Sequence, residues 1–333
     1  MTFENILSEL KNKIYRPFYF LMGDEPFFID KITDYIHKHV LSESERPFNE
    51  TIFYGKDTDI PAIINSARRF PMMSNYQVVI VREAQEIKDI EELSVYLDAP
   101  LKSTILVINY KYKSLDKRKK FYKIVQEKGI LFESKKFYDD KIPDWIRDYV
   151  KSAGYEIDLN STMIMTEYLG NDLIKISNEI DKLLICLPEE SRKITPEQVE
   201  SNIGISKDFN NFELQKALIQ RNKFKSYQIA DYFSKNQKNN PFALTIISLF
   251  SFFSKLMLYS TLKISNNKEI ASKLKIHPFF VSDYQRGSKV FEKKKIVQII
   301  SLLREYDLKS KGVNNVSTSN GELLKELLYK IFN

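Results

Sequence analysis

The sequence predicts an α/β domain built on a parallel sheet, followed by two domains made only of helices. From the start to about residue 138, apolar β-prone runs alternate with stretches of helical periodicity. After about residue 139 this alternation stops and one helical pattern follows another. A polar stretch at 206–211 divides the helical part, so we expect domains at 1–139, 140–207 and 208–333.

Five runs in the first domain are expected to be its strands, at 18–22, 51–54, 77–81, 104–110 and 130–132. The runs at 78–81 and 105–108 are continuously apolar, which is typical of central strands buried on both faces. Because helical stretches alternate with these runs, we expect the strands to be parallel and covered by helices.

The helical part begins near Pro143, which suits the first turn of a helix. Periodicity of 3.6 residues then predicts the helices of the last domain, with Pro241 and Pro278 near two helix starts. These helices are expected at 211–221, 224–236, 241–263, 267–274, 278–284, 291–310 and 320–332.

Composition narrows the classes of protein. We expect no membrane span, because no apolar run approaches the ~18 residues that one needs, and residues 1–11 lack the features of a signal peptide. We therefore expect a cytoplasmic protein without a membrane partner. Because the chain has only Cys186 and three histidines, we expect no metal site, and Cys186 should be a buried thiol. The net charge of +7 permits contact with nucleic acid without requiring it.

The turn after the first strand is where an α/β nucleotide-binding domain holds phosphate. Here two carboxylates would repel a triphosphate and a proline removes an amide donor; the four residues are Gly23, Asp24, Glu25 and Pro26. The strand at 77–81 is followed by Arg82 and Glu83 and lacks the aspartate that would hold Mg²⁺. We therefore expect a degenerate nucleotide site without a cofactor, while an active but divergent site is the alternative.

A second feature is an apolar segment between a helix and the strand at 77–81, made of Phe70, Pro71, Met72 and Met73. Flexible apolar side chains on a loop can fill a partner's pocket. The alternative is that the two methionines cover the core of their own domain.

A third feature is the basic segment 111–120, whose densest part is Lys117, Arg118, Lys119 and Lys120. Such a segment suits contact with nucleic-acid phosphates. A solvated helix start explains the same pattern.

Three segments, 19–30, 69–83 and 172–183, together with shorter ones at 240–244, 277–280 and 306–310, carry a resemblance along essentially the whole length. In order and spacing the chain resembles the delta subunits of bacterial DNA polymerase III clamp loaders.

The resemblance implies a RecA-like AAA+ domain, a small helical lid and a helical collar that joins the ATPase subunits and delta-prime in a ring. It implies a protein with no catalytic site of its own that works within the DNA polymerase holoenzyme. Such a subunit would open the sliding clamp with a hydrophobic wedge, typically Leu-Phe and here Met72-Met73, for loading onto primed DNA. Neighbouring subunits would carry the ATP.

Two further alternatives come from other classes. Another non-catalytic ring subunit, such as delta-prime, would carry zinc-binding cysteines and a Ser-Arg-Cys motif, but here the one cysteine, Cys186, follows Ile185. A general DNA-binding helical protein would bind DNA alone, with strong salt dependence.

Overall fold

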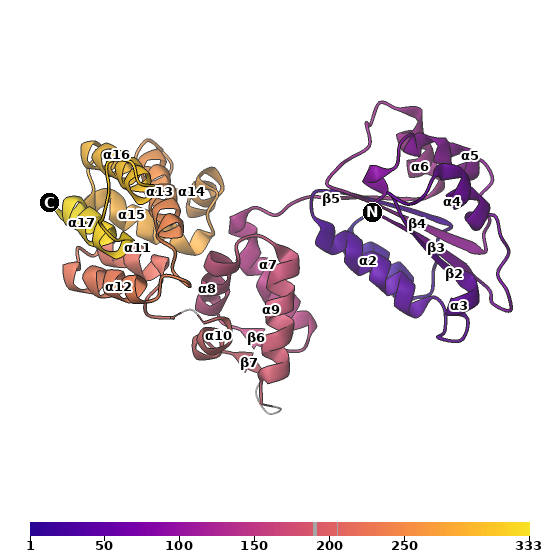
Figure 1. The fold of residues 1–333 in the computed structure, drawn as a ribbon, viewed down its shortest axis with the longest axis horizontal. Helices are drawn as coiled ribbons and strands as arrows, with labels where there is room; N and C mark the ends of the chain where they lie inside the picture. The colour runs from indigo at the N-terminus through magenta and orange to yellow at the C-terminus, as the bar shows by residue number, and fades with distance from the viewer. Residues whose placement is uncertain (189–191, 205) are drawn as a thin grey trace. The chain divides into compact units, whose positions relative to one another are not determined.

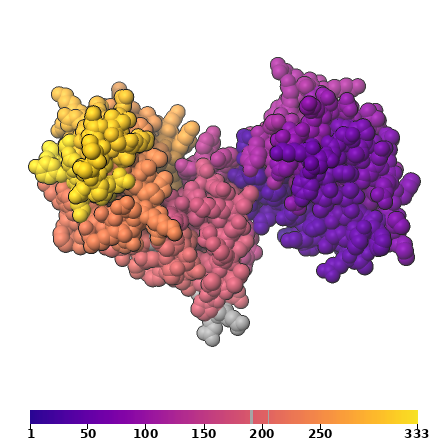
Figure 2. Space-filling view, in the orientation of Figure 1, coloured from indigo at the N-terminus to yellow at the C-terminus, as the bar shows by residue number. Residues whose placement is uncertain are grey.

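A computed structural model describes residues 1–188, 192–204 and 206–333 of the chain. These residues form two compact units, Met1–Phe137 and Tyr138–Asn333. In the space-filling view the first unit runs from indigo to purple and the second from magenta to yellow (Figure 2). The expected mixture of an α/β part and a mainly helical part is confirmed.

The first unit is built on a parallel sheet of five strands, and all five expected strands are confirmed (Figure 1). In spatial order β2-β3-β4-β1-β5, every neighbouring pair is parallel. The central strands are buried along nearly their whole length, as their continuous apolar sequence requires. The strands are β1 Phe18–Gly23, β2 Glu50–Tyr54, β3 Gln77–Arg82, β4 Thr104–Lys111 and β5 Ile130–Ser134.

Helices cover both faces of this sheet. α2 (Pro26–His39) lies on one face, with α1 (Phe3–Lys11) packed against it, while α4 (Ile60–Ala67), α5 (Ser94–Leu97) and α6 (Lys120–Lys128) lie on the other face (Figure 1). Side chains that alternate along β1, β3 and β4 pack against the second group and form one buried apolar cluster. The short α3 (Arg46–Asn49) directly precedes the edge strand β2.

The second unit begins with four helices: α7 Ile142–Ser152, α8 Leu159–Leu169, α9 Leu173–Cys186 and α10 Pro196–Ile203. The expectation of an all-helical part is wrong in one respect, because β6 (Glu156–Ile157) and β7 (Lys193–Ile194) form a two-stranded parallel sheet. Strands of two residues are too short for a period-2 pattern to reveal them. The expected burial of Cys186 is also wrong, since the residue is exposed at the end of α9.

Seven further helices follow in the order expected from periodicity. Two expected bounds are wrong: α13 ends at Tyr259 and not at 263, and in place of a helix at 278–284 a 3₁₀ turn at Pro278–Phe280 precedes α15, which ends at Val290. Asparagines cap several of them, and Ser319 and Glu322 form a capping box at the start of α17. The helices are α11 Asn211–Ile219, α12 Lys223–Lys235, α13 Phe242–Tyr259, α14 Asn267–Leu274, α15 Val281–Val290, α16 Lys293–Ser310 and α17 Asn320–Phe332.

The expectation that no apolar run approaches the length of a membrane span is wrong for the helix α13. Among the described residues it is the one helix that passes a test of length and composition for crossing a membrane. Its side chains Leu249, Phe253 and Leu256 are nevertheless fully buried in the core of the second unit, where α13 packs against α16. Core packing explains only part of this apolar run, because 39% of the helix is buried and Leu244, Ile247 and Phe250 are exposed.

Candidate functional site

The segment that the sequence singles out as a binding element is a projecting loop. Residues 69–76, here called the methionine loop, connect α4 to β3. Phe70 is 76% exposed, Met72 55% and Met73 103%. Both methionine side chains thus lie outside the core of their own unit, which excludes the alternative that they cover it.

A buried asparagine from a distant part of the chain holds this loop. Asn49, at the end of α3, is only 4% exposed. Its Oδ1 accepts from the backbone N–H of Met72 at 2.6 Å, and its Nδ2 donates to the Met72 carbonyl at 3.0 Å. Nδ2 also donates to the Glu45 carbonyl at 3.0 Å. Both polar groups of the Met72 backbone are therefore fixed by one side chain, and the thioether is left pointing outward.

The base of the methionine loop is fixed from the sheet side. The Gln77 side chain is buried at the start of β3, and its Nε2 lies 2.6 Å from the Arg69 carbonyl and 3.1 Å from that of Ser66. Thr104 Oγ1, at the start of β4, donates to the Ala67 carbonyl at 2.9 Å. These contacts hold the end of α4 and the start of the loop in fixed positions at the amino ends of β3 and β4.

The sequence interpretation missed Asn49 and its neighbour in the chain, Phe48, which is 65% exposed. Met73 has a φ of 53°, a left-handed conformation that costs free energy in a residue other than glycine. No sequence signal marks Asn49, because 23 residues separate it from Met72. Only the fold joins the two.

The loop that the sequence predicts to be a degenerate nucleotide site, residues 23–26, lies at the carboxyl end of β1, and its backbone packs against other segments of the first unit. Gly23 has a φ of 120°, and a Cβ on it would lie 1.9 Å from the carbonyl oxygen of Ser134. The amides of the loop donate to neighbouring protein atoms, so they are not turned toward a phosphate. The N–H of Gly23 donates to the Lys113 carbonyl, that of Asp24 to the Ser134 carbonyl, and that of Glu25 to Ser134 Oγ.

The same loop ends in a self-capped helix. The buried Glu25 carboxylate accepts from the N–H of Phe27 at 3.2 Å, and Pro26 supplies no amide. In the first turn of α2, the N–H of Phe27 therefore donates to the Glu25 carboxylate, which takes the place that a bound phosphate would need.

A cation from β4 occupies the position between the strand ends. Lys111 Nζ lies 2.8 Å from Asp30 Oδ1 on α2 and 3.4 Å from Glu83 Oε1 after β3. In a live nucleotide site these strand ends would face phosphate and Mg²⁺. Here the acidic and basic groups neutralise one another. Within residues 1–188, 192–204 and 206–333, no group of three His, Cys, Asp or Glu residues could hold a metal ion.

Three of the four residues in the basic segment make ion pairs with nearby carboxylates. Lys117 Nζ lies 3.1 Å from Glu133, and Arg118 lies 2.7 Å from Asp116. Lys119 pairs with Glu91, and Lys120 is the exposed first residue of α6. The segment is therefore a solvated turn and helix start whose charge is partly balanced.

Comparison with known proteins gives concordant matches. The family model described as DNA polymerase III, delta subunit, matches residues 19–135, and residues 208–328 match the model for the C-terminal domain of the same family. The DNA polymerase III subunit delta of Bacillus subtilis (strain 168) is 26% identical over 98% of this chain and 95% of that protein. Subunit delta of Buchnera aphidicola subsp. Schizaphis graminum is 24% identical over 71% of each. The solved structure of the Bacillus subtilis DNA clamp loader delta protein has a similar fold, with 22% identity, a TM-score of 0.60 and 99% of each chain covered.

Proposed function

The chain belongs to the DNA polymerase III delta subunit family, and from this premise we propose that it binds a sliding clamp and opens it with the methionine loop. One observation carries the proposal: Met72 and Met73 are exposed on a backbone that Asn49 holds in place. A preformed apolar loop loses little conformational entropy on binding, so more of its contact energy appears as affinity.

The magnitudes suit a reversible contact. Each methionine side chain that enters an apolar pocket contributes about 1.5–3 kcal/mol before ordering costs. Met is unbranched and adapts to irregular pockets, so the pair serves in place of the Leu-Phe pair typical of the family. To open a ring, the loop must bind the distorted clamp interface more tightly than the closed one. Phe70, in the same loop, is a further exposed apolar side chain that can contact the clamp.

We also propose that the subunit does not hydrolyse ATP and that neighbouring subunits of the clamp loader supply this activity. Two observations support this. The backbone N–H groups at 23–25 already donate hydrogen bonds within the protein, and Lys111 forms ion pairs at the strand ends. The competing function, an active divergent ATPase, predicts saturable binding of Mg-ATP by the isolated chain. No observation here favours it.

The remaining partners follow from the family. We propose that the last domain, residues 208–333, is the collar that joins the ATPase subunits and delta-prime. Two exposed apolar side chains on its helices, Phe250 and Val297, support a role in assembly. Primed DNA is the partner of the assembled complex, and residues 117–120 are the candidate contacts, since a phosphate can replace the carboxylate partners of Lys117, Arg118 and Lys119. Alanine at all four positions should lower the salt dependence of DNA binding by the complex.

The clamp proposal is tested with the purified chain and the sliding clamp of the same organism, by surface plasmon resonance without nucleotide. The double substitution Met72→Ser and Met73→Ser should weaken binding at least tenfold, because the apolar contact is lost. Val316→Ser is the matched control, because Val316 is as exposed as Met73 but lies between α16 and α17. Clamp affinity unchanged by the double substitution would reject the assignment.

A further inference from the structure

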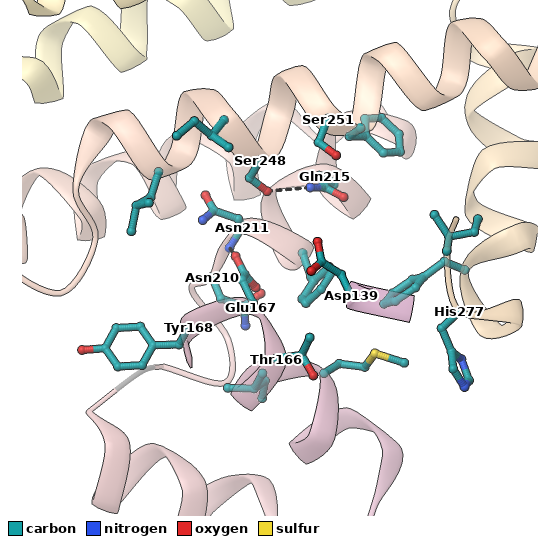
Figure 3. Close-up of a pocket in the computed structure, with 18 of the residues that line it drawn as sticks. Asp139, Thr166, Glu167, Tyr168, Asn210, Asn211, Gln215, Ser248, Ser251 and His277 are labelled. Atoms are coloured by element: carbon teal, nitrogen blue, oxygen red, sulfur yellow. Dashed lines mark hydrogen bonds between the residues drawn. The ribbon is translucent and has the colours of Figure 1, made fainter. Parts of the chain in front are cut away.

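The second unit contains a cleft that the clamp proposal does not use. It lies between the end of α8 and the helices α11 and α13, and has a volume of about 420 Å³ (Figure 3). Cavities of this size hold small organic molecules in other proteins. Leu244 and Ile247 of α13 line the cleft with 51% and 61% exposure, so an apolar wall faces the cleft.

A carboxylate with one unpaired oxygen lies in this cleft. Glu167 of α8 accepts from the backbone N–H of Asn211, the first residue of α11, through Oε1 at 2.9 Å. Its other oxygen, Oε2, is shielded from solvent and accepts no hydrogen bond from any residue that the structure describes. The same is true of Asn211 Oδ1, and the two side chains lie together in the middle of the cleft (Figure 3).

The two oxygens require the same kind of partner. Both are acceptors, so a group that carries N–H donors satisfies them together. Burial raises the pKa of Glu167 to about 7. Hydrogen bonds from Asn211 and from the backbone of Phe212 oppose this shift, and the nearby Glu213 adds to it. A buried carboxylate without a cation is costly, and a charged donor removes this cost.

Several other polar groups that line the cleft interact with groups of this chain. Gln215 Nε2 donates to Ser248 Oγ at 2.9 Å (Figure 3). Lys216 Nζ lies 2.7 Å from Glu213. Lys255 lies in the field of Asp139 and Asp140. Among the ion pairs of the described residues, none joins Glu167 to a cation of this chain, so the unmet demand in the cleft is for a cation from outside.

We propose that this cleft binds a small organic cation, in which an ammonium or guanidinium group on an apolar body donates to Glu167 Oε2 and Asn211 Oδ1. The apolar body lies against Leu244 and Ile247. Such a ligand contacts α8, α11 and α13 at once, and it therefore holds the end of α8 against the helices of the last domain. The inference does not depend on clamp binding.

The test uses the full chain and three probes in ligand-observed NMR titrations: phenylbutylamine, its alcohol analogue phenylbutanol, and methylammonium. The amine should bind saturably and compete with itself, while the alcohol and the short cation should bind roughly tenfold to hundredfold more weakly. Equal binding of amine and alcohol, or no saturable binding of the amine, would overturn the proposal.

Two substitutions identify the site. Glu167→Gln keeps an acceptor for the Asn211 N–H and removes the charge, so amine binding should weaken roughly tenfold to hundredfold. Leu244→Ser removes part of the apolar wall and should weaken it severalfold. Its control is Leu258→Ser, since Leu258 is on the same helix and 45% exposed but lies outside the cleft. Amine affinity that neither Glu167→Gln nor Leu244→Ser alters would show that the probe binds elsewhere and would refute the inference.

Discussion

The substitution Asn49→Ala removes the buried amide that holds the methionine loop without touching any side chain proposed to meet the clamp. It breaks two hydrogen bonds to Met72 and one to Glu45. Loop groups regain some bonds with water, so we count the two Met72 bonds at about 0.5–1.5 kcal/mol each, or about 1–3 kcal/mol in total. This is the free energy by which the projecting conformation loses stability relative to other loop conformations.

The consequence for binding follows from the population of the competent conformation. The apparent clamp affinity equals the intrinsic affinity multiplied by the fraction of molecules that keep the loop in place, so it falls as this fraction falls. A loss of about 1–3 kcal/mol sets an upper limit of roughly 5-fold to 150-fold on the weakening. We expect surface plasmon resonance to show weaker clamp binding, and urea unfolding to show a stability loss of the same order.

Asn75→Ala is the matched control, since Asn75 is an exposed residue of the same loop and the same residue type. It should change neither quantity by more than about 0.5 kcal/mol. The reasoning is refuted if Asn49→Ala lowers stability as expected but leaves clamp affinity equal to that of the unsubstituted chain. The methionine loop would then bind the clamp equally well without the Asn49 hydrogen bonds to Met72.

Three further outcomes concern the rest of the chain. Gly23→Ala should cost about 3 kcal/mol or more in urea unfolding, because its Cβ meets the Ser134 carbonyl and its φ is positive. Lys111→Met should cost about 1–3 kcal/mol, since two partly exposed carboxylates lose their shared cation, and a gain in stability would contradict the ion-pair argument. The pKa of Glu167 is raised to about 7, so the folded chain keeps a proton that the unfolded chain releases near pH 4.5, and stability should fall as pH rises between these values. Glu167→Gln should reduce this fall, as measured by unfolding across that range.

Much of the fold could be predicted from local patterns. Continuous apolar runs such as 78–81 and 105–108 identified buried strands, while the turn unsuited to phosphate at 23–26 stays a prediction from residue types. These properties depend on residues close together in the chain. The two-residue strands β6 and β7 could not be predicted in this way, because a pattern needs more residues than they contain.

The sequence by itself determined the order of the secondary elements, the buried strands and the chemistry available in each loop. Whether Met72 and Met73 cover a core or project from it was decided by tertiary structure, through a hydrogen-bonded side chain 23 residues away. The same holds for the cleft, where Glu167 meets Asn211 across 44 residues. Burial and hydrogen-bond partners depend on which distant segments the fold brings together, and no local pattern of residue types records that.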